Sequence, residues 1–113
     1  ATVLQTNQTP YSWQFPKVAG TMPKAEELVV YELLVRDFIG SHSYQDLIDS
    51  LQYLKRLGVN AIQLMPIMEF EGNESWGYNP MYYFAPDKYY GTKNDLKEFI
   101  DKAHEMGMVV ILD

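Results

Sequence analysis

Apolar residues recur along the chain in blocks whose spacing alternates between that of strands and that of helices. Residues 28–35 form a nearly continuous apolar run, which is typical of a strand covered on both faces. Residues 59–65 form a second, shorter run that ends at Pro66, since proline cannot continue a central ladder. Residues 109–112 form a third run, directly followed by Asp113. The pattern predicts three strands.

Two amphipathic segments separate these runs. Ser43 can cap a helix that Gly58 ends, and its apolar positions recur at three- and four-residue intervals: Leu47, Ile48, Leu51, Leu54 and Leu57. Thr92 begins a second helix in a capping arrangement with Asp95, and Gly107 ends it. Its expected inner face consists of Leu96, Phe99, Ile100, Ala103 and Met106. The order β-α-β-loop-α-β predicts an α/β fold with parallel strands and right-handed crossovers.

Two segments lack such periodicity. Residues 66–91 are expected to form a loop without regular elements, and a loop of that length in a compact domain usually has a function. Residues 1–27 contain three of the six prolines and are interpreted as a linker or an extended arm, compatible with a preceding, removed N-terminal domain. Residues 28–113 are then the N-terminal part of a catalytic domain.

Three strands are too few to close a barrel, which takes eight strands and typically about 250 residues. We therefore expect this chain to be the opening portion of a larger α/β catalytic domain. Its open sheet edges are expected to promote self-association. Asp113 would lie at the C-terminal tip of a parallel strand, where barrel enzymes place their chemistry.

Composition narrows the function classes. A hydrophobic content of 47% with 14% aromatic residues indicates a folded chain, and a net charge of -6 disfavours a nucleic-acid surface. The absence of cysteine excludes disulfides and thiolate metal sites. No apolar run approaches the roughly 20 residues that span a bilayer. An uncharged or weakly polar small ligand fits this composition and net charge best.

Eight of the sixteen aromatic residues fall in the long loop, namely Phe70, Trp76, Tyr78, Tyr82, Tyr83, Phe84, Tyr89 and Tyr90. Aromatic faces with polar handles suit sugars, which present C–H arrays ringed by hydroxyls. Packing against the rest of the domain is the favoured role for Tyr82, Tyr83, Phe84 and Tyr89. For Trp76 and Tyr78, packing and ligand binding are about equally favoured. Gly77 and Pro80 fix a tight backbone conformation there, which is expected to leave the segment exposed.

The remaining polar candidates are assigned structural roles. Arg36 and Asp37, which follow the first strand, could face the active-site end, but a structural ion pair or loop hydrogen bonds are favoured. The loop carboxylates are expected to form a solvated rim and not an acid/base pair, because irregular backbone gives them no reason to converge: Glu69, Glu71 and Glu74. His104 is expected to be a partly exposed surface residue on the flank of the second helix. For His42, a ligand role is the less favoured alternative.

Five motifs, taken in order, resemble the first part of an α-amylase family catalytic barrel. They are residues 58–67, the Ser75–Pro80 run SWGYNP, the Tyr83–Pro86 run YFAP, the Tyr90–Thr92 run YGT, and residues 109–113. The resemblance covers about residues 29–113. It implies a (β/α)8 TIM barrel, of which this chain is the portion truncated after the third strand. It also implies a glycoside hydrolase or transglycosylase that acts on α-linked glucans with retention, using two carboxyl groups about 5–5.5 Å apart.

The resemblance also implies roles for single residues. Tyr78 matches the tyrosine that stacks on the sugar at the cleavage subsite, and Asp113 matches an acidic residue that supports the site without being the nucleophile. Trp76 is a further substrate-binding candidate. The nucleophile, the acid/base and a third carboxylate would lie on later strands, so no catalytic residue is expected within this chain, which alone should be inactive. Trp13 and Phe15 are expected to pack on the barrel flank.

Two alternatives remain open. A non-catalytic carbohydrate-binding or assembly module on a degenerate barrel would need only the loop aromatics. A nucleotide-binding βαβ unit is remote, because no glycine-rich phosphate motif follows a strand. No cofactor is expected; calcium is common in the family, but these residues do not assemble the six to eight oxygens that it needs. The expected partner is an α-glucan or maltooligosaccharide, with no nucleic acid or membrane, and the resemblance favours export or the cell envelope.

Overall fold

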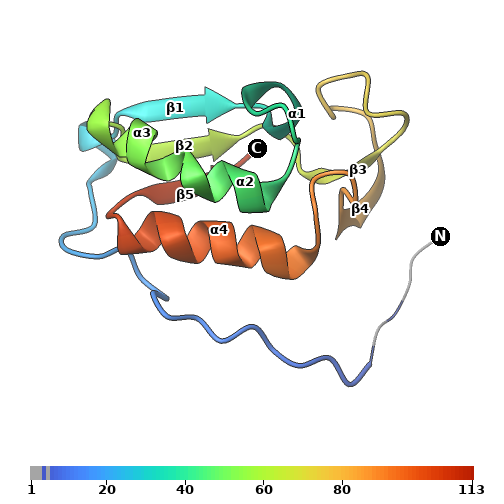
Figure 1. The fold of residues 1–113 in the computed structure, drawn as a ribbon, viewed down its shortest axis with the longest axis horizontal. Coiled ribbons are helices and arrows are strands. Elements are labelled where there is room, and N and C mark those ends of the chain that lie inside the picture. Colours follow the sequence, from blue (N-terminus) through green and yellow to red (C-terminus); the bar gives the residue numbers. More distant parts are fainter. Residues whose placement is uncertain (1–3, 5) are drawn as a thin grey trace.

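A three-stranded parallel sheet forms the centre of the molecule. The computed structural model describes residues 4 and 6–113. Its strands are β1 (Val30–Leu33), β2 (Ala61–Leu64) and β5 (Val109–Leu112), in the order β1-β2-β5. The three strands run in the same direction, so their C-terminal ends share one edge of the sheet (Figure 1). This arrangement confirms the predicted parallel β-α-β order.

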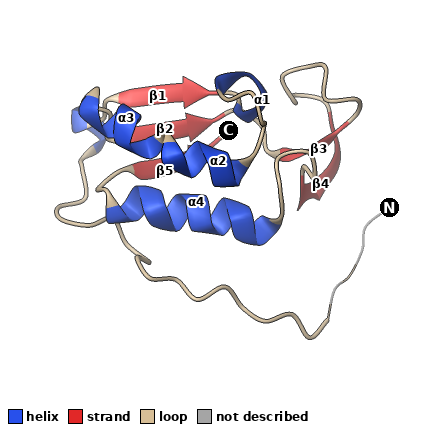
Figure 2. Ribbon diagram, viewed as in Figure 1, coloured by secondary structure: helices blue, strands red, loops and turns tan. Residues whose placement is uncertain are grey.

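Helices cover one face of this sheet (Figure 2). They are α2 (Tyr44–Asp49), α3 (Leu51–Arg56) and α4 (Lys93–Glu105). The core lies between them and the strands and includes the fully buried side chains of Leu47, Leu51, Leu54, Ile62, Leu64 and Phe99. Among the described residues, no helix is both long and apolar enough to cross a membrane.

The boundaries of the first two elements differ from the prediction. The first strand is shorter than residues 28–35, because the backbone after Leu34 turns into the single helical turn α1 (Val35–Phe38). The helix predicted over residues 43–58 is divided at Ser50 into α2 and α3. Its predicted ends are confirmed, since Ser43 Oγ accepts a hydrogen bond from the Gln45 backbone and Gly58 has a φ of 86°.

The second helix and the third strand are confirmed. Thr92 Oγ1 accepts a hydrogen bond from the Asp95 backbone N–H, and the Asp95 carboxylate accepts one from the Thr92 backbone N–H. This reciprocal cap satisfies two backbone donors that the first helical turn would otherwise leave free. Gly107, with a φ of 77°, follows the helix, and β5 begins two residues later.

The prediction of an irregular loop over residues 66–91 is wrong. This segment contains a two-stranded antiparallel hairpin, β3 (Met68–Phe70) and β4 (Pro80–Pro86), which lies beyond the C-terminal ends of the parallel strands (Figure 1). Its pairing is irregular, with register shifts on both sides of Glu69. A strand of three residues with irregular register gives little period-two signal, which is why the pattern missed it.

The N-terminal arm runs along α4 and is held there by Asp101. Residues 6–24 contain no helix or strand, and the 3-10 helix η1 (Ala25–Glu27) precedes β1. Asp101 is only 3% exposed, and its carboxylate accepts hydrogen bonds from Tyr11 Oη at 3.1 Å, Gln14 N at 2.9 Å and Phe15 N at 2.6 Å. His104 is partly exposed, as predicted, and its Nδ1 lies 2.9 Å from Phe15 O. Trp13 lies edge-on to the Tyr11 ring.

Candidate functional site

Tyr78 and Asp113 meet at the C-terminal edge of the parallel sheet. The Tyr78 hydroxyl donates a hydrogen bond of 2.6 Å to Asp113 Oδ2. The Asp113 backbone N–H donates to Leu64 O at 3.1 Å, so the strand pairing continues as far as this residue. The hydrogen bond to Asp113 raises the pKa of Tyr78 to about 12, with smaller contributions from desolvation and the Asp113 charge. The phenol therefore remains a protonated donor at neutral pH.

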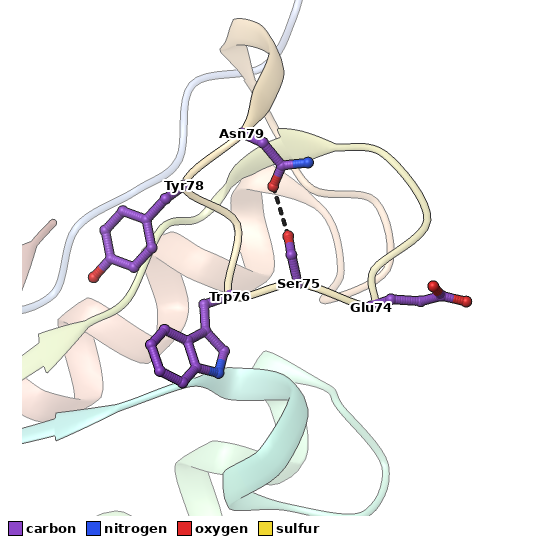
Figure 3. A pocket seen from close by; sticks show the side chains of 5 residues that line it. All are labelled: Glu74, Ser75, Trp76, Tyr78 and Asn79. Atoms are coloured by element: carbon purple, nitrogen blue, oxygen red, sulfur yellow. Dashed lines mark hydrogen bonds between the residues drawn. The ribbon is translucent and has the colours of Figure 1, made fainter.

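The loop before β4 presents two aromatic side chains beside a pocket of about 490 Å³. Trp76 is 62% exposed and Tyr78 is 56% exposed. Figure 3 shows both rings on one side of the loop, whereas the Glu74 side chain points away from them. The turn between the rings is closed by Ser75 Oγ, which donates to Asn79 Oδ1 at 2.6 Å and accepts from Gly77 N at 3.2 Å.

Gly77 fixes the path of this loop. It is buried and has a φ of 92°, a conformation that side-chain-bearing residues rarely adopt. A Cβ atom at this position would lie 3.1 Å from Pro66 Cβ and 3.2 Å from Phe70 Cε1. The backbone between Trp76 and Tyr78 is therefore pressed against the inner part of the hairpin, where only glycine can be accommodated without displacement.

Arg36 anchors the same loop to the end of β1. Its Nη1 atom donates to Asn73 O at 2.9 Å and to Ser75 O at 2.6 Å. The predicted ion pair with Asp37 is confirmed, with 2.7 Å between Nε and Oδ1, and this hydrogen bond raises the pKa of Arg36. The two carbonyl contacts are loop hydrogen bonds of the predicted kind. Their partners could not be named from the sequence, because backbone carbonyls leave no residue-type signature.

His42 belongs to the turn that supports Arg36. It has a φ of 59°, and its Nδ1 lies 2.7 Å from Arg36 O. Its ring stacks on Tyr89, with ring centroids 5.1 Å apart. Both contacts engage the His42 ring with other protein groups. They therefore support a structural role for His42 over a role in ligand binding.

The loop carboxylates do not form an acid/base pair. Glu71 and Glu74 are exposed, but the solvated-rim interpretation is wrong for Glu69, which is paired with the Lys88 ammonium group and accepts the Lys88 backbone N–H at 3.1 Å. Burial acts to raise the pKa of Glu69, and the contacts with Lys88 outweigh it and lower the pKa. Within the part of the chain that the structure describes, no group of three or more His, Asp or Glu side chains could hold a metal ion.

The packing prediction for the loop aromatics is wrong for two residues. Tyr83 is 68% exposed and Phe84 is 95% exposed, both on β4. Tyr82 is half-buried, and Tyr89 is 46% exposed with its ring stacked on His42. Phe70 and Tyr90 are the members of the group that enter the core, with exposed fractions of 2% and 1%.

The sequence pattern of the alpha-amylase catalytic domain matches residues 36–113. Over 90 residues, which are 80% of the chain, the sequence is 41% identical to a malto-oligosyltrehalose trehalohydrolase from Saccharolobus solfataricus, of which it covers 16%. Over 63 residues, which are 56% of the chain, it is 56% identical to a 1,4-alpha-glucan-branching enzyme from Aspergillus oryzae, of which it covers 9%. The chain thus spans less than a fifth of either relative.

Solved structures share the fold. An alpha-amylase candidate from Salmonella typhimurium matches 91% of this chain with a TM-score of 0.84 and 39% identity, and the match covers 17% of that chain. The catalytic module of SpuA, a glycogen-degrading pneumococcal virulence factor, matches 92% with a TM-score of 0.78 and 27% identity, over 20% of that chain. The parallel sheet and its helices match part of an alpha-amylase TIM barrel, which confirms the predicted fold. The chain belongs to the α-amylase family, within the catalytic domain that defines it.

Proposed function

We propose that this chain forms the opening part of a catalytic barrel that cleaves or rearranges α-linked glucans, and that Tyr78, Trp76 and Asp113 bind the sugar. The observation that carries the proposal is the 2.6 Å hydrogen bond between Tyr78 and Asp113 at the C-terminal edge of the sheet. Barrel enzymes assemble their active sites at that edge. The names of the two relatives, a malto-oligosyltrehalose trehalohydrolase and a glucan-branching enzyme, point to the same substrate class.

Tyr78, Asp113 and Trp76 have different roles in the proposed sugar binding. The ring of Tyr78 offers a face on which one glucose unit can stack, and its hydroxyl, held by Asp113, fixes the ring orientation. A carboxylate has about four lone-pair sites, so Asp113 can accept a sugar hydroxyl while it accepts Tyr78. Trp76, exposed on the same side of the loop, extends the aromatic surface to a neighbouring glucose unit (Figure 3).

Asp113 serves as a supporting residue in this proposal. Retaining chemistry needs two carboxyl groups about 5–5.5 Å apart, one as nucleophile and one as acid/base. Glu74 points away from the aromatic pair and Glu69 is engaged by Lys88. We infer that the reacting carboxylates belong to polypeptide outside these 113 residues. The 113-residue chain alone should bind glucan weakly and should not hydrolyse it.

A non-catalytic carbohydrate-binding module is the second candidate. It is favoured by the combination of an exposed aromatic pair with carboxylates that are engaged or directed elsewhere. The two functions differ in turnover, so NMR of the full-length protein with maltooligosaccharides separates them. A retaining enzyme releases products in the α-anomeric form, whereas a binding module leaves the oligosaccharide intact.

The site itself is tested by Tyr78→Ala in the full-length protein. We expect the affinity for maltoheptaose to fall about tenfold, because the stacking face is lost. Tyr53→Ala is the matched control, since Tyr53 is 50% exposed on α3, away from the sheet edge. Unchanged affinity in a folded Tyr78→Ala protein would remove the role that we assign to Tyr78.

A further inference from the structure

We propose that Asp87 and Glu69 share one proton at the base of the β3–β4 hairpin, and that loss of this proton loosens the hairpin. The inference goes beyond the proposed glucan binding and does not depend on it. Asp87 directly follows β4, and its side chain is fully buried. A buried carboxylate is costly when it is ionised, unless donors or a cation compensate its charge.

Asp87 is fixed on both sides of its backbone, yet one of its carboxyl oxygen atoms lacks a donor. Its Oδ1 atom accepts a hydrogen bond from the Tyr89 backbone N–H at 2.8 Å. Its backbone N–H donates to Ile67 O at 2.7 Å, and its carbonyl oxygen accepts from Tyr90 N at 3.2 Å. Its Oδ2 atom has no hydrogen-bond partner among the residues that the structure describes. A full negative charge at this carboxyl would therefore be only partly compensated.

Glu69 on β3 lies within hydrogen-bonding reach of the Asp87 side chain. The Glu69 carboxylate accepts the Lys88 backbone N–H at 3.1 Å and is paired with the Lys88 ammonium group. Lys88 thus compensates the charge of Glu69. Two ionised carboxylates have no donor to offer each other, so a hydrogen bond between them requires one proton. A proton on Asp87 supplies this donor and removes the buried charge.

The surroundings of the two carboxyl groups favour this division of charge. Burial is the largest effect on the pKa of Asp87 and raises it, and the charge of Glu69 raises it further against the opposing effects of Tyr89 N and Lys88. The contacts with Lys88 lower the pKa of Glu69. Carboxylates that share a site separate in this way, one keeping the proton that the other loses.

The other ionisable groups around Asp87 keep their charge state between about pH 5 and about pH 9. The hydroxyls of Tyr44 on α2 and of Tyr90 are buried, and burial raises the pKa of Tyr44 and raises that of Tyr90 to about 12. Both phenols therefore stay protonated. Arg36 and Asp37, which act on Tyr90 from α1, form an ion pair with each other.

The sign of the expected pH dependence follows from the raised pKa of Asp87. In the unfolded chain an aspartate titrates near about pH 3.9, so the folded chain holds the proton to higher pH. The contribution of Asp87 to the stability of the hairpin is therefore complete below about pH 4 and is lost as the pH rises through the folded pKa. The loop that carries Trp76 and Tyr78 lies between the two strands that are loosened.

Hydrogen exchange of residues 67–90 in the full-length protein, measured by mass spectrometry from about pH 5 to about pH 9, tests the proposal. After correction for the intrinsic dependence on pH, we expect protection in the wild type to fall about tenfold, which corresponds to one unit of pKa. Asp87→Asn keeps an acceptor for Tyr89 N and offers Glu69 an N–H donor at every pH. Its protection should not change with pH.

Glu69→Gln separates a shared proton from the effect of burial alone. It removes the neighbouring charge and offers Asp87 an amide donor, so the pH dependence should disappear here too. His42→Asn, which removes the imidazole stacked on Tyr89, is the control and should keep the wild-type dependence.

Three results would overturn the shared proton. The first is protection in the wild type that does not change with pH. The second is the same pH dependence in the wild type and in a folded Asp87→Asn protein. The third is a wild-type dependence in Glu69→Gln, which would show that Asp87 holds its proton without Glu69. If Asp87→Asn does not fold, the comparison of the wild type with Glu69→Gln decides.

Discussion

The guanidinium of Arg36 lies 2.6 Å from the carbonyl oxygen of Ser75, although 39 positions separate the two residues. This contact ties the loop that carries Trp76 and Tyr78 to the turn after β1. The same guanidinium group also donates from Nη1 to the Asn73 carbonyl and from Nε to the Asp37 carboxylate. Both sides of the group are therefore hydrogen-bonded. The orientation of the aromatic pair is therefore set from a different element of the sheet edge.

Arg36→Ala is expected to weaken glucan binding and to lower the free energy of unfolding by about 2 kcal/mol, since hydrogen bonds to a charged group are lost. Arg36→Lys should keep only part of the glucan affinity and part of the stability, because an ammonium group cannot reproduce the planar fork of donors. Urea unfolding and maltoheptaose titration of the full-length protein measure the two effects. Wild-type affinity in Arg36→Ala would show that the loop holds its geometry unaided.

Gly77 provides a test of loop position with a built-in control. Gly77→Ala should lower the free energy of unfolding by about 2–3 kcal/mol and weaken glucan binding, because it combines a positive φ with close contacts to Pro66 and Phe70. Gly72→Ala introduces a similar backbone strain at a φ of 74° with no atom within 4 Å of the new Cβ. It should cost about 1 kcal/mol and spare binding. Equal effects of the two substitutions on affinity would contradict the role of close packing at Gly77.

The arm contact at Asp101 predicts a dependence of stability on pH. Burial acts to raise the pKa of Asp101, but hydrogen bonds from Gln14, Phe15 and Tyr11 outweigh it and hold the pKa below its usual value. The folded chain therefore binds fewer protons than the unfolded chain at pH values just below about 4, the ordinary value for this side chain. The stabilisation is complete above about pH 4 and is lost as the pH falls through the folded pKa.

Asp101→Asn should remove this dependence and cost about 2 kcal/mol at neutral pH, because an amide cannot accept all three donors. Urea unfolding at several pH values measures both effects, and limited trypsin digestion at Lys17 and Lys24 reports release of the arm. Asp49→Asn on the exposed side of α2 is the control. If the wild type and Asp101→Asn lost stability in parallel on acidification, the pH dependence would have another source.

The edges of the sheet predict self-association of the 113-residue chain. In the described structure β1 and β5 each pair with β2 alone, and Val30 and Leu112 on these edges are about half exposed. Unpaired strand edges offer backbone groups to other chains. We expect the mass from light scattering to increase with concentration, and Val30→Lys to reduce the increase. A monomer over a wide concentration range would contradict the proposal.

The parts of the fold that could be predicted from the sequence depend on local patterns. The cap formed by Thr92 and Asp95 spans three residues, and the apolar run of β5 is continuous. The position of Asp113 at the C-terminal edge of the sheet followed from topology, because parallel strands place their C-terminal ends at one edge. Tyr78 was assigned to the same site only by the resemblance, and its hydrogen bond to Asp113 was not predicted. The substrate-binding roles of these residues stay predictions.

Other features depend on contacts that sequence patterns do not encode. Asp101 has the helical position of a surface carboxylate, and its partners Gln14 and Phe15 lie 87 and 86 positions away. Arg36 binds carbonyl groups, which every residue carries. The hairpin escaped prediction because β3 has only three residues and an irregular register with β4.

A crystal structure of the full-length protein with bound maltoheptaose tests the central claim most directly. The account predicts a glucose ring stacked on Tyr78, with one of its hydroxyls donating to the Asp113 carboxylate. A glucan bound at the opposite end of the strands, or a Tyr78 ring covered by polypeptide, would contradict it.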